Sequence, residues 1–263
     1  MTNLLGPAHT LYVGTAGWTI PRSRADGIRD EGTHLERYAG LFPCVEINSS
    51  FYRSHMARTY HKWAAATPAH FRFALKVPRV ITHDQRLRAA REPLERFLGE
   101  TADLSTKRGP LLVQLPPSLA FDEKVTVEFF DVVRSRYEGA VVCEPRHATW
   151  FSPTADAVLV RYRIARVAAD PAPVGAASTP GGWKGLAYYR LHGSPRTYWS
   201  RYDASMIGTL ADRLLALPVA SEVWCIFDNT ASGAAFENAW ELREHLASAI
   251  TRSRRAVPRR GLR

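Results

Sequence analysis

The sequence predicts one α/β domain of the (β/α)8 type, a TIM-type barrel in which eight parallel strands alternate with helices. Three observations support this fold class. Short apolar runs typical of strands recur eight times, helix-like segments separate most of them, and nearly all end on a charged or amide residue. The length of 263 residues matches one such barrel. An active site is therefore expected where the strands end.

The eight expected strands are residues 11–14, 44–48, 71–76, 111–114, 141–144, 165–170, 186–192 and 223–228. Helix starts separate several of them. Thr33 with Glu36 forms a capping box, Ser152 precedes Pro153 at a helix start, and Ser232 is expected to cap a last helix running towards Ile250. Residues 171–185 contain three prolines and four glycines, so the barrel should be irregular after its sixth strand.

The net charge of +10 is concentrated at the carboxyl end. Six of the 35 basic residues lie in the last twelve positions; without them 29 basic residues face 25 acidic ones, a balance of +4. We expect a barrel domain over residues 1–250 and a disordered Arg-rich tail over residues 251–263. Such a tail is usually solvated, and nucleic acid is the partner it would bind.

Other features indicate a soluble, cytoplasmic protein without a membrane partner. The first ten residues lack a secretory pattern, and no run approaches the length of a membrane span. The three cysteines, Cys44, Cys143 and Cys225, lie inside strand-like runs and are expected to be buried core residues.

The strand period of two predicts which side chains point into the barrel. Since apolar residues should face the helices, the polar residues of alternate parity should face inward at the strand ends. This argument selects nine candidate catalytic residues: Glu46, Asn48, Lys76, Gln114, Glu144, Asp170, Arg190, His192 and Asp228.

Strand adjacency then predicts pairs. Lys76 should meet Glu46 or Gln114, and Arg190 should meet Asp170 or Asp228. The alternative is an ion-pair layer that fills the barrel and performs no chemistry.

The loops after the last two strands suggest a phosphate site, which is common at this place in the fold. Gly193, Ser194, Arg196 and Asn229, with the helix start at Ser232, offer donors and free amides. Tight turns with a simple cap are the alternative. Aromatic residues in the loops that follow several of the strands suit stacking on sugars or bases, and Trp18 and Tyr52 are the ones we assign to substrate binding.

Several motifs together resemble the YecE-like family, a group with a domain of unknown function. They are GTAGW at 14–18, VEINSSFYR at 45–53, ITH at 81–83, GPLLVQLPPSL at 109–119, EPRHATW at 144–150, RLHGSP at 190–195 and FDNTASGAA at 227–235. The resemblance implies a TIM barrel but no settled reaction. It adds His83, Arg146 and His147 to the candidate residues, the last two as substrate-binding groups.

The sequence departs from the family pattern at Ala16, where serine is usual, at residues 20–22 and at residues 105–106.

Three classes of function remain open. We favour an enzyme without a required metal, acting on a phosphate- or sugar-bearing substrate, with Glu46 or Glu144 as acid or base and His192 as proton shuttle. A divalent-metal hydrolase or isomerase is the second class, although Lys76 and Arg190 would place positive charge beside the metal. The third is a non-catalytic nucleic-acid binder that uses the tail.

Overall fold

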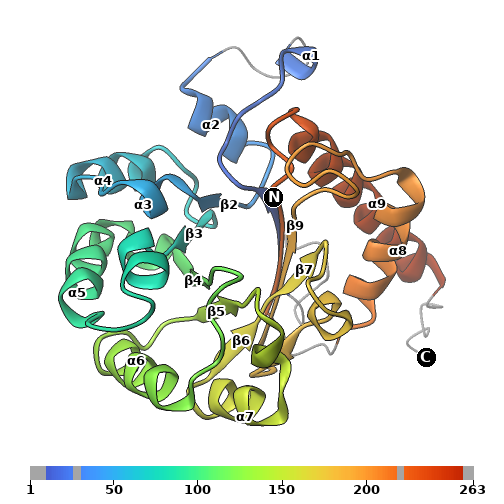
Figure 1. Ribbon diagram of the computed structural model, residues 1–263. Helices are drawn as coiled ribbons and strands as arrows, with labels where there is room; N and C mark the ends of the chain where they lie inside the picture. Colours follow the sequence, from blue (N-terminus) through green and yellow to red (C-terminus); the bar gives the residue numbers. More distant parts are fainter. Residues whose placement is uncertain (1–9, 26–30, 218–221, 257–263) are drawn as a thin grey trace, which may run out of the picture.

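Parallel strands occupy the centre of the molecule and helices surround them, as Figure 1 shows. The computed structural model describes residues 10–25, 31–217 and 222–256. The expected mixed α/β architecture is confirmed. The strands pair into two sheets rather than one ring. The orders are β1-β10-β9-β7 and β2-β3-β4-β5-β6-β8, with all neighbours parallel except β6 and β8.

The strands of the first sheet are β1 (Thr10–Thr15), β7 (Ala168–Asp170), β9 (Leu186–Leu191) and β10 (Glu222–Phe227). The second sheet contains β2 (Cys44–Ile47), β3 (Arg72–Lys76), β4 (Arg108–Gln114), β5 (Val141–Glu144), β6 (Ile164–Arg166) and β8 (Gly181–Gly182).

The α-helices are α1 (Arg22–Ala25), α2 (His34–Ala39), α3 (Ser49–Tyr52), α4 (Ala57–Ala65), α5 (Arg91–Glu100), α6 (Glu123–Arg136), α7 (Pro153–Arg161), α8 (Ala204–Leu215) and α9 (Ala234–Ala256). A π-helical turn, η1 (Val80–Asp84), and three 3-10 turns, η2 (Ala102–Lys107), η3 (Ala148–Phe151) and η4 (Gly175–Ser178), lie between them.

Two junctions connect the sheets. The chain passes from β6 into β7 through Val167, whose amide donates to the carbonyl of Cys143 at 2.9 Å. At the other junction Ala16 forms a parallel bridge with Glu46, and the amide of Gly17 donates to the carbonyl of Glu46 at 2.9 Å. The ends of the two sheets therefore meet at both junctions.

Alternate residues of the strands contribute to two separate apolar clusters, as their period of two requires. The larger cluster packs the strands against the helices. The smaller is drawn from strand residues of the opposite parity: Cys44, Ala74, Leu112, Val142, Ala165, Val167, Leu186, Tyr188, Trp224 and Ile226. Residues two positions further on extend this inner face to the strand ends.

Most of the predicted helix starts are confirmed. Thr33 and Glu36 form the capping box of α2, and Ser152 caps α7 with Pro153 in its first turn. Ser232 was expected to cap the last helix, but α9 begins at Ala234 and the Ser232 hydroxyl donates to the Trp199 carbonyl at 2.6 Å. The Ser232 hydroxyl is therefore bonded to the loop after β9 and does not cap α9.

The segment after the sixth expected strand is irregular, as its prolines and glycines predicted. It contains η4 and the two-residue strand β8, which pairs antiparallel with β6. The expected disordered tail from residue 251 is wrong for its first part, because α9 continues to Ala256. The remaining tail, residues 257–263, lies outside the described residues. Among the described residues, none of the helices combines the length and apolar character needed to cross a bilayer.

Candidate active site

Arg190 lies at the centre of a buried cluster at the strand ends. Its guanidinium pairs bidentately with Glu46, at 3.0 Å from Nε to Oε2 and 2.6 Å from Nη2 to Oε1. It also donates to Glu144 Oε2 at 2.6 Å and to Asp228 Oδ2 at 2.9 Å. These four residues are almost fully buried. Three carboxylates thus compensate one cation that is out of water.

Tyr188 completes the cluster and was missed by the sequence argument. Its hydroxyl donates to Glu46 Oε2 at 2.8 Å, and its ring belongs to the inner apolar cluster. It precedes Arg190 by two positions on β9, so the strand period that selected Arg190 and His192 also pointed to it.

His192 connects two of the carboxylates. Its Nδ1 lies 3.0 Å from Asp228 Oδ2, and its Nε2 lies 2.8 Å from Glu144 Oε1. Arg146 approaches the same place, with Nη2 at 2.6 Å from His192 Nε2 and 2.5 Å from Glu144 Oε1. Nδ1 is thus paired with Asp228, while the Glu144 carboxylate and the Arg146 guanidinium compete for Nε2.

This geometry allows two hydrogen-bond arrangements that differ by one proton. With both ring nitrogens protonated, His192 donates to Asp228 and to Glu144. With only Nδ1 protonated, His192 donates to Asp228 while Nε2 accepts from Arg146. The proton on Nε2 therefore decides whether Arg146 donates to His192 or to Glu144 alone.

The carboxylates are held ionised by their neighbours. Burial raises the pKa of Glu144, but Arg190, Arg146 and His192 reverse this and keep that pKa well below its ordinary range. For Asp228 burial also raises the pKa, and Arg190, His192 and Lys76 lower it by more. Both groups are therefore proton acceptors at neutral pH.

Lys76, at the end of β3, is buried without a carboxylate partner. No ion pair or hydrogen bond of its ammonium is found within the described residues, and Nζ lies 4.2 Å from the centre of the Phe51 ring. Burial lowers the pKa of Lys76 and Arg190 lowers it further, while Glu46, Glu144 and Asp228 offset part of this. The predicted pairing of Lys76 with Glu46 or Gln114 is wrong, because Glu46 turns to Arg190.

Other predicted residues lie at the edge of this cluster. Asn48 donates from Nδ2 to Asp228 Oδ1 at 3.3 Å. Gln114 is half-buried and lies beside Glu144 in the pairing of β4 with β5. His83 packs edge-on against Phe51, with ring centres 4.9 Å apart.

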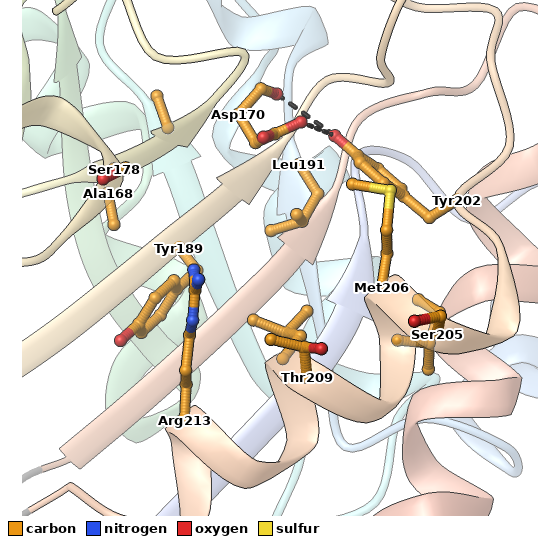
Figure 2. Close-up of a pocket in the computed structure, with 13 residues that line it drawn as sticks. Ala168, Asp170, Ser178, Tyr189, Leu191, Tyr202, Ser205, Met206, Thr209 and Arg213 are labelled. Atoms are coloured by element: carbon orange, nitrogen blue, oxygen red, sulfur yellow. Dashed lines mark hydrogen bonds between the residues drawn. The ribbon is translucent and has the colours of Figure 1, made fainter. Parts of the chain in front are cut away.

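Asp170 does not belong to the cluster, and its predicted pairing with Arg190 is wrong. Val167 belongs to the inner cluster and Ala168 to the outer one, so Asp170 shares the outward parity of Ala168. Figure 2 shows Asp170 facing Tyr202, whose hydroxyl donates to Asp170 Oδ1 at 2.7 Å. The two residues line a cavity of about 260 Å³ between β7, β9 and α8.

The proposed phosphate loop uses most of its donors internally. The Gly193 amide donates to the Tyr202 hydroxyl at 2.8 Å, and the amides of Gly233 and Ala235 bond to loop carbonyls. Asn229 donates to Ser200 and Asn238, while Arg196 stacks on Trp199 at 4.4 Å. The amides of Gly193, Gly233 and Ala235 are thus bonded within the loops, as the tight-turn alternative expects, and phosphate binding at this place stays a prediction.

The four other predicted substrate-binding residues differ in their surroundings. His147 caps η3 and accepts from the amide of Thr149, which is a structural role. Trp18 packs edge-on against Trp63, and Tyr52 is exposed next to Phe51. Ser194 is half-buried in the loop after β9.

A metal centre would have to use the same carboxylates. Within the described residues, no group of three histidine, cysteine or acidic side chains is arranged to hold a metal ion. Arg190 lies where Glu46, Glu144 and Asp228 converge, so the donor set already surrounds a cation. These residues do not fit a divalent metal.

Fold and geometry together define an α/β protein with a buried, charged cluster at the ends of its parallel strands. The chain belongs to the family described as protein of unknown function DUF72, whose model matches residues 12–261. The resemblance to the YecE-like family is thereby confirmed.

Relatives support this assignment. The chain is 30% identical over 173 residues to UPF0759 protein YecE of Escherichia coli K12, covering 64% of this chain and 61% of that protein. It is 32% identical over 152 residues to UPF0759 protein YunF of Bacillus subtilis 168, covering 54% of this chain and 53% of that protein. These matches therefore span less than two thirds of the relatives' length.

Solved structures of the family share the fold. A DUF72 family protein from Enterococcus faecalis V583 superposes with a TM-score of 0.73 at 23% identity, covering 90% of this chain and 97% of that one. One from Thermotoga maritima MSB8 gives 0.72 at 23% identity, with 90% and 98% covered.

Proposed function

We propose that this protein is an enzyme that acts on a sugar- or phosphate-bearing small molecule at the strand ends, with Glu144, His192 and Asp228 as its acid–base unit. In this proposal the two sheets act as one (β/α)8 barrel. The contacts at both junctions and the inner apolar cluster support that architecture. Such barrels carry their active sites at the ends of the strands.

One observation carries the proposal: the cluster contains polar atoms that it does not satisfy. A purely structural ion-pair layer should pair its buried groups. Here Nε of Arg146 and Oδ1 of Asn48 are buried without a hydrogen-bond partner, and the Lys76 ammonium has no ion pair among the described residues. Arg146 and Asn48 contact the Glu144–His192–Asp228 unit, and a polar substrate would supply the partners that their buried atoms lack.

Tyr198, which packs on the His192 ring, supports the same site. Tyr198 packs edge-on against the His192 ring at 5.8 Å and adopts a left-handed backbone conformation, with φ of 69°. For a bulky residue this conformation is costly, and such strain gathers at functional sites. Tyr198 is 48% exposed, so its ring is available to a sugar or base.

An activity screen tests the proposal, using phosphatase, esterase, glycosidase, nuclease and sugar-isomerisation assays in chelator-treated buffer. With the activity found, His192→Asn should lower kcat about 10²- to 10⁴-fold, as removal of an acid–base group does. Asp170→Asn is the matched control, since it alters a strand-end carboxylate outside the cluster. Equal activity of His192→Asn and the wild type would contradict the proposal.

The same screen separates the alternatives. Restoration of activity by a divalent metal alone would favour the metal hydrolase or isomerase. Binding of oligonucleotides that falls steeply with salt, without turnover, would favour the nucleic-acid binder.

A further inference from the structure

We propose that the Lys76 amine is a nucleophile that forms an imine with the carbonyl group of the substrate, so that the substrate is an aldehyde or ketone such as an open-chain sugar. This inference rests on the proposed function, because it assigns the substrate class of the same site.

The first argument is the contrast between lysine and arginine in this chain. Of the 35 basic residues only five are lysines: Lys62, Lys76, Lys107, Lys124 and Lys184. Arginine stays protonated in proteins and is not a nucleophile, whereas a lysine amine can lose its proton when it is buried. The buried strand-end position of β3 thus carries the less common of the two cations.

The second argument is the surroundings of the Lys76 amine. It lies against the face of Phe51, near the Arg190 guanidinium, and its exposed fraction is 8%. A desolvated amine next to a second cation is the arrangement that activates Schiff-base lysines. Arg190 and Arg146 make the direct ion pairs with the three carboxylates, so Lys76 acts on them only through space and its nitrogen is not held in a salt bridge.

Lys107 shows that burial alone does not produce this arrangement. Burial lowers its pKa as well. Its Nζ, however, donates to the Ala64 carbonyl at 2.6 Å and to both the carbonyl and the hydroxyl of Thr67. Lys107 lies just before β4, at the opposite end of the strands, and its amine is used for structure.

The chemistry balances without an oxidant or reductant. The Lys76 nitrogen, as the neutral amine, adds to the carbonyl carbon; its two hydrogens pass to the carbonyl oxygen, which leaves as water, so that a C=N bond replaces the C=O bond. The protonated imine then accepts the electron pair when a bond at the neighbouring carbon breaks. The Glu144–His192–Asp228 unit takes or returns the proton, and water hydrolyses the imine and restores the amine.

Borohydride trapping tests the inference on the full chain. The protein is incubated with glycolaldehyde or glycolaldehyde phosphate, reduced with sodium borohydride and mapped by peptide mass spectrometry. Each reduced adduct adds the mass of the probe less one oxygen. We expect Lys76 to be labelled at least about tenfold faster than the exposed Lys124, and to reach full reactivity at a lower pH. Lys107 should stay unlabelled.

One variant completes the test. Lys76→Arg keeps the charge and should lose the label at this peptide, and it should abolish turnover of any carbonyl substrate found in the activity screen. A Lys76 peptide that is unlabelled, or labelled no faster than Lys124, overturns the inference. If the Lys76 peptide is not labelled but activity still depends on His192, the proposed function stands without the imine. If Lys76 is labelled but no turnover is found, the imine is supported and the proposed acid–base function fails.

Discussion

Two buried cations, Arg190 and Lys76, lie at the ends of the strands, and their surroundings differ. Arg190 is held by Glu46, Glu144 and Asp228, all within 3.0 Å. Lys76 has an aromatic ring beside it and no ion pair among the described residues. The neighbours raise the pKa of Arg190 well above its ordinary value and leave that of Lys76 lowered. A fully paired cation organises a site, and an incompletely paired one remains available for reaction.

Removal of Arg190 should have the largest effect. Arg190→Met leaves Glu46 and Asp228 buried without their guanidinium partner and Glu144 with Arg146 alone, and breaking a buried pair in this way costs about 3 to 5 kcal/mol or more. Urea unfolding of the variant at pH 7 measures the loss. Glu46→Gln is the milder companion if Arg190→Met does not fold. A loss below about 1 kcal/mol in both variants would mean that the cluster is solvated.

The second-largest effect should be on the pH dependence of stability, because Glu144 is ionised in the folded protein. The pKa of Glu144 is lower in the folded protein than its ordinary value of 4.5, so its contribution is present above that pH and is lost as the pH falls towards the folded value. Each such group adds about 1.4 kcal/mol per pH unit to the slope in this window. Glu144→Gln should flatten the acid limb of unfolding curves measured from pH 7 downward. An unchanged slope would contradict the assignment.

Lys76→Met should leave stability at pH 7 unchanged or increase it. Since the pKa of Lys76 is lowered by folding, the protonated amine destabilises the native state, and this cost is relieved as the pH rises towards 10.5. The Tm difference between variant and wild type should therefore shrink from pH 7 to pH 10. A clear loss of Tm at pH 7 would show that Lys76 is a structural counter-ion like Arg190.

Asp170→Asn should have the smallest effect. The hydroxyl of Tyr202 can still donate to the amide oxygen, so we expect a change in unfolding free energy within about 1 kcal/mol. Thermal unfolding next to Glu144→Gln provides the comparison. A loss as large as that of Arg190→Met would return Asp170 to the central cluster.

The strand pattern predicted where the site lies but not how its members pair. Parity counted from apolar neighbours placed Glu46, Glu144, Arg190, His192 and Asp228 together. It failed at Asp170. The inward-facing residues of this segment are Ala165 and Val167, so Asp170, three positions after Val167, points outward. Pairing failed for Lys76 because adjacency of strands ignores how far a long side chain reaches across the interior.

The loop donors failed for a different reason. The Gly193 amide donates to the hydroxyl of Tyr202, nine residues later in the chain. Neither the residue types nor their spacing predicts this hydrogen bond. The helical course of α9 to Ala256 likewise exceeds what the charge of the segment suggested, since arginine is a good helix former.

Glu46 connects two parts of the molecule, because its backbone pairs with the segment after β1 and its side chain pairs with Arg190. The backbone carbonyl of Glu46 accepts the Gly17 amide where β1 meets β2, and its side chain grips Arg190. A transient opening of that junction would displace Glu46 and so weaken its ion pair with Arg190. Amide hydrogen exchange at Gly17 should therefore report on the charge cluster, and a ligand that tightens this cluster should slow that exchange without touching Gly17.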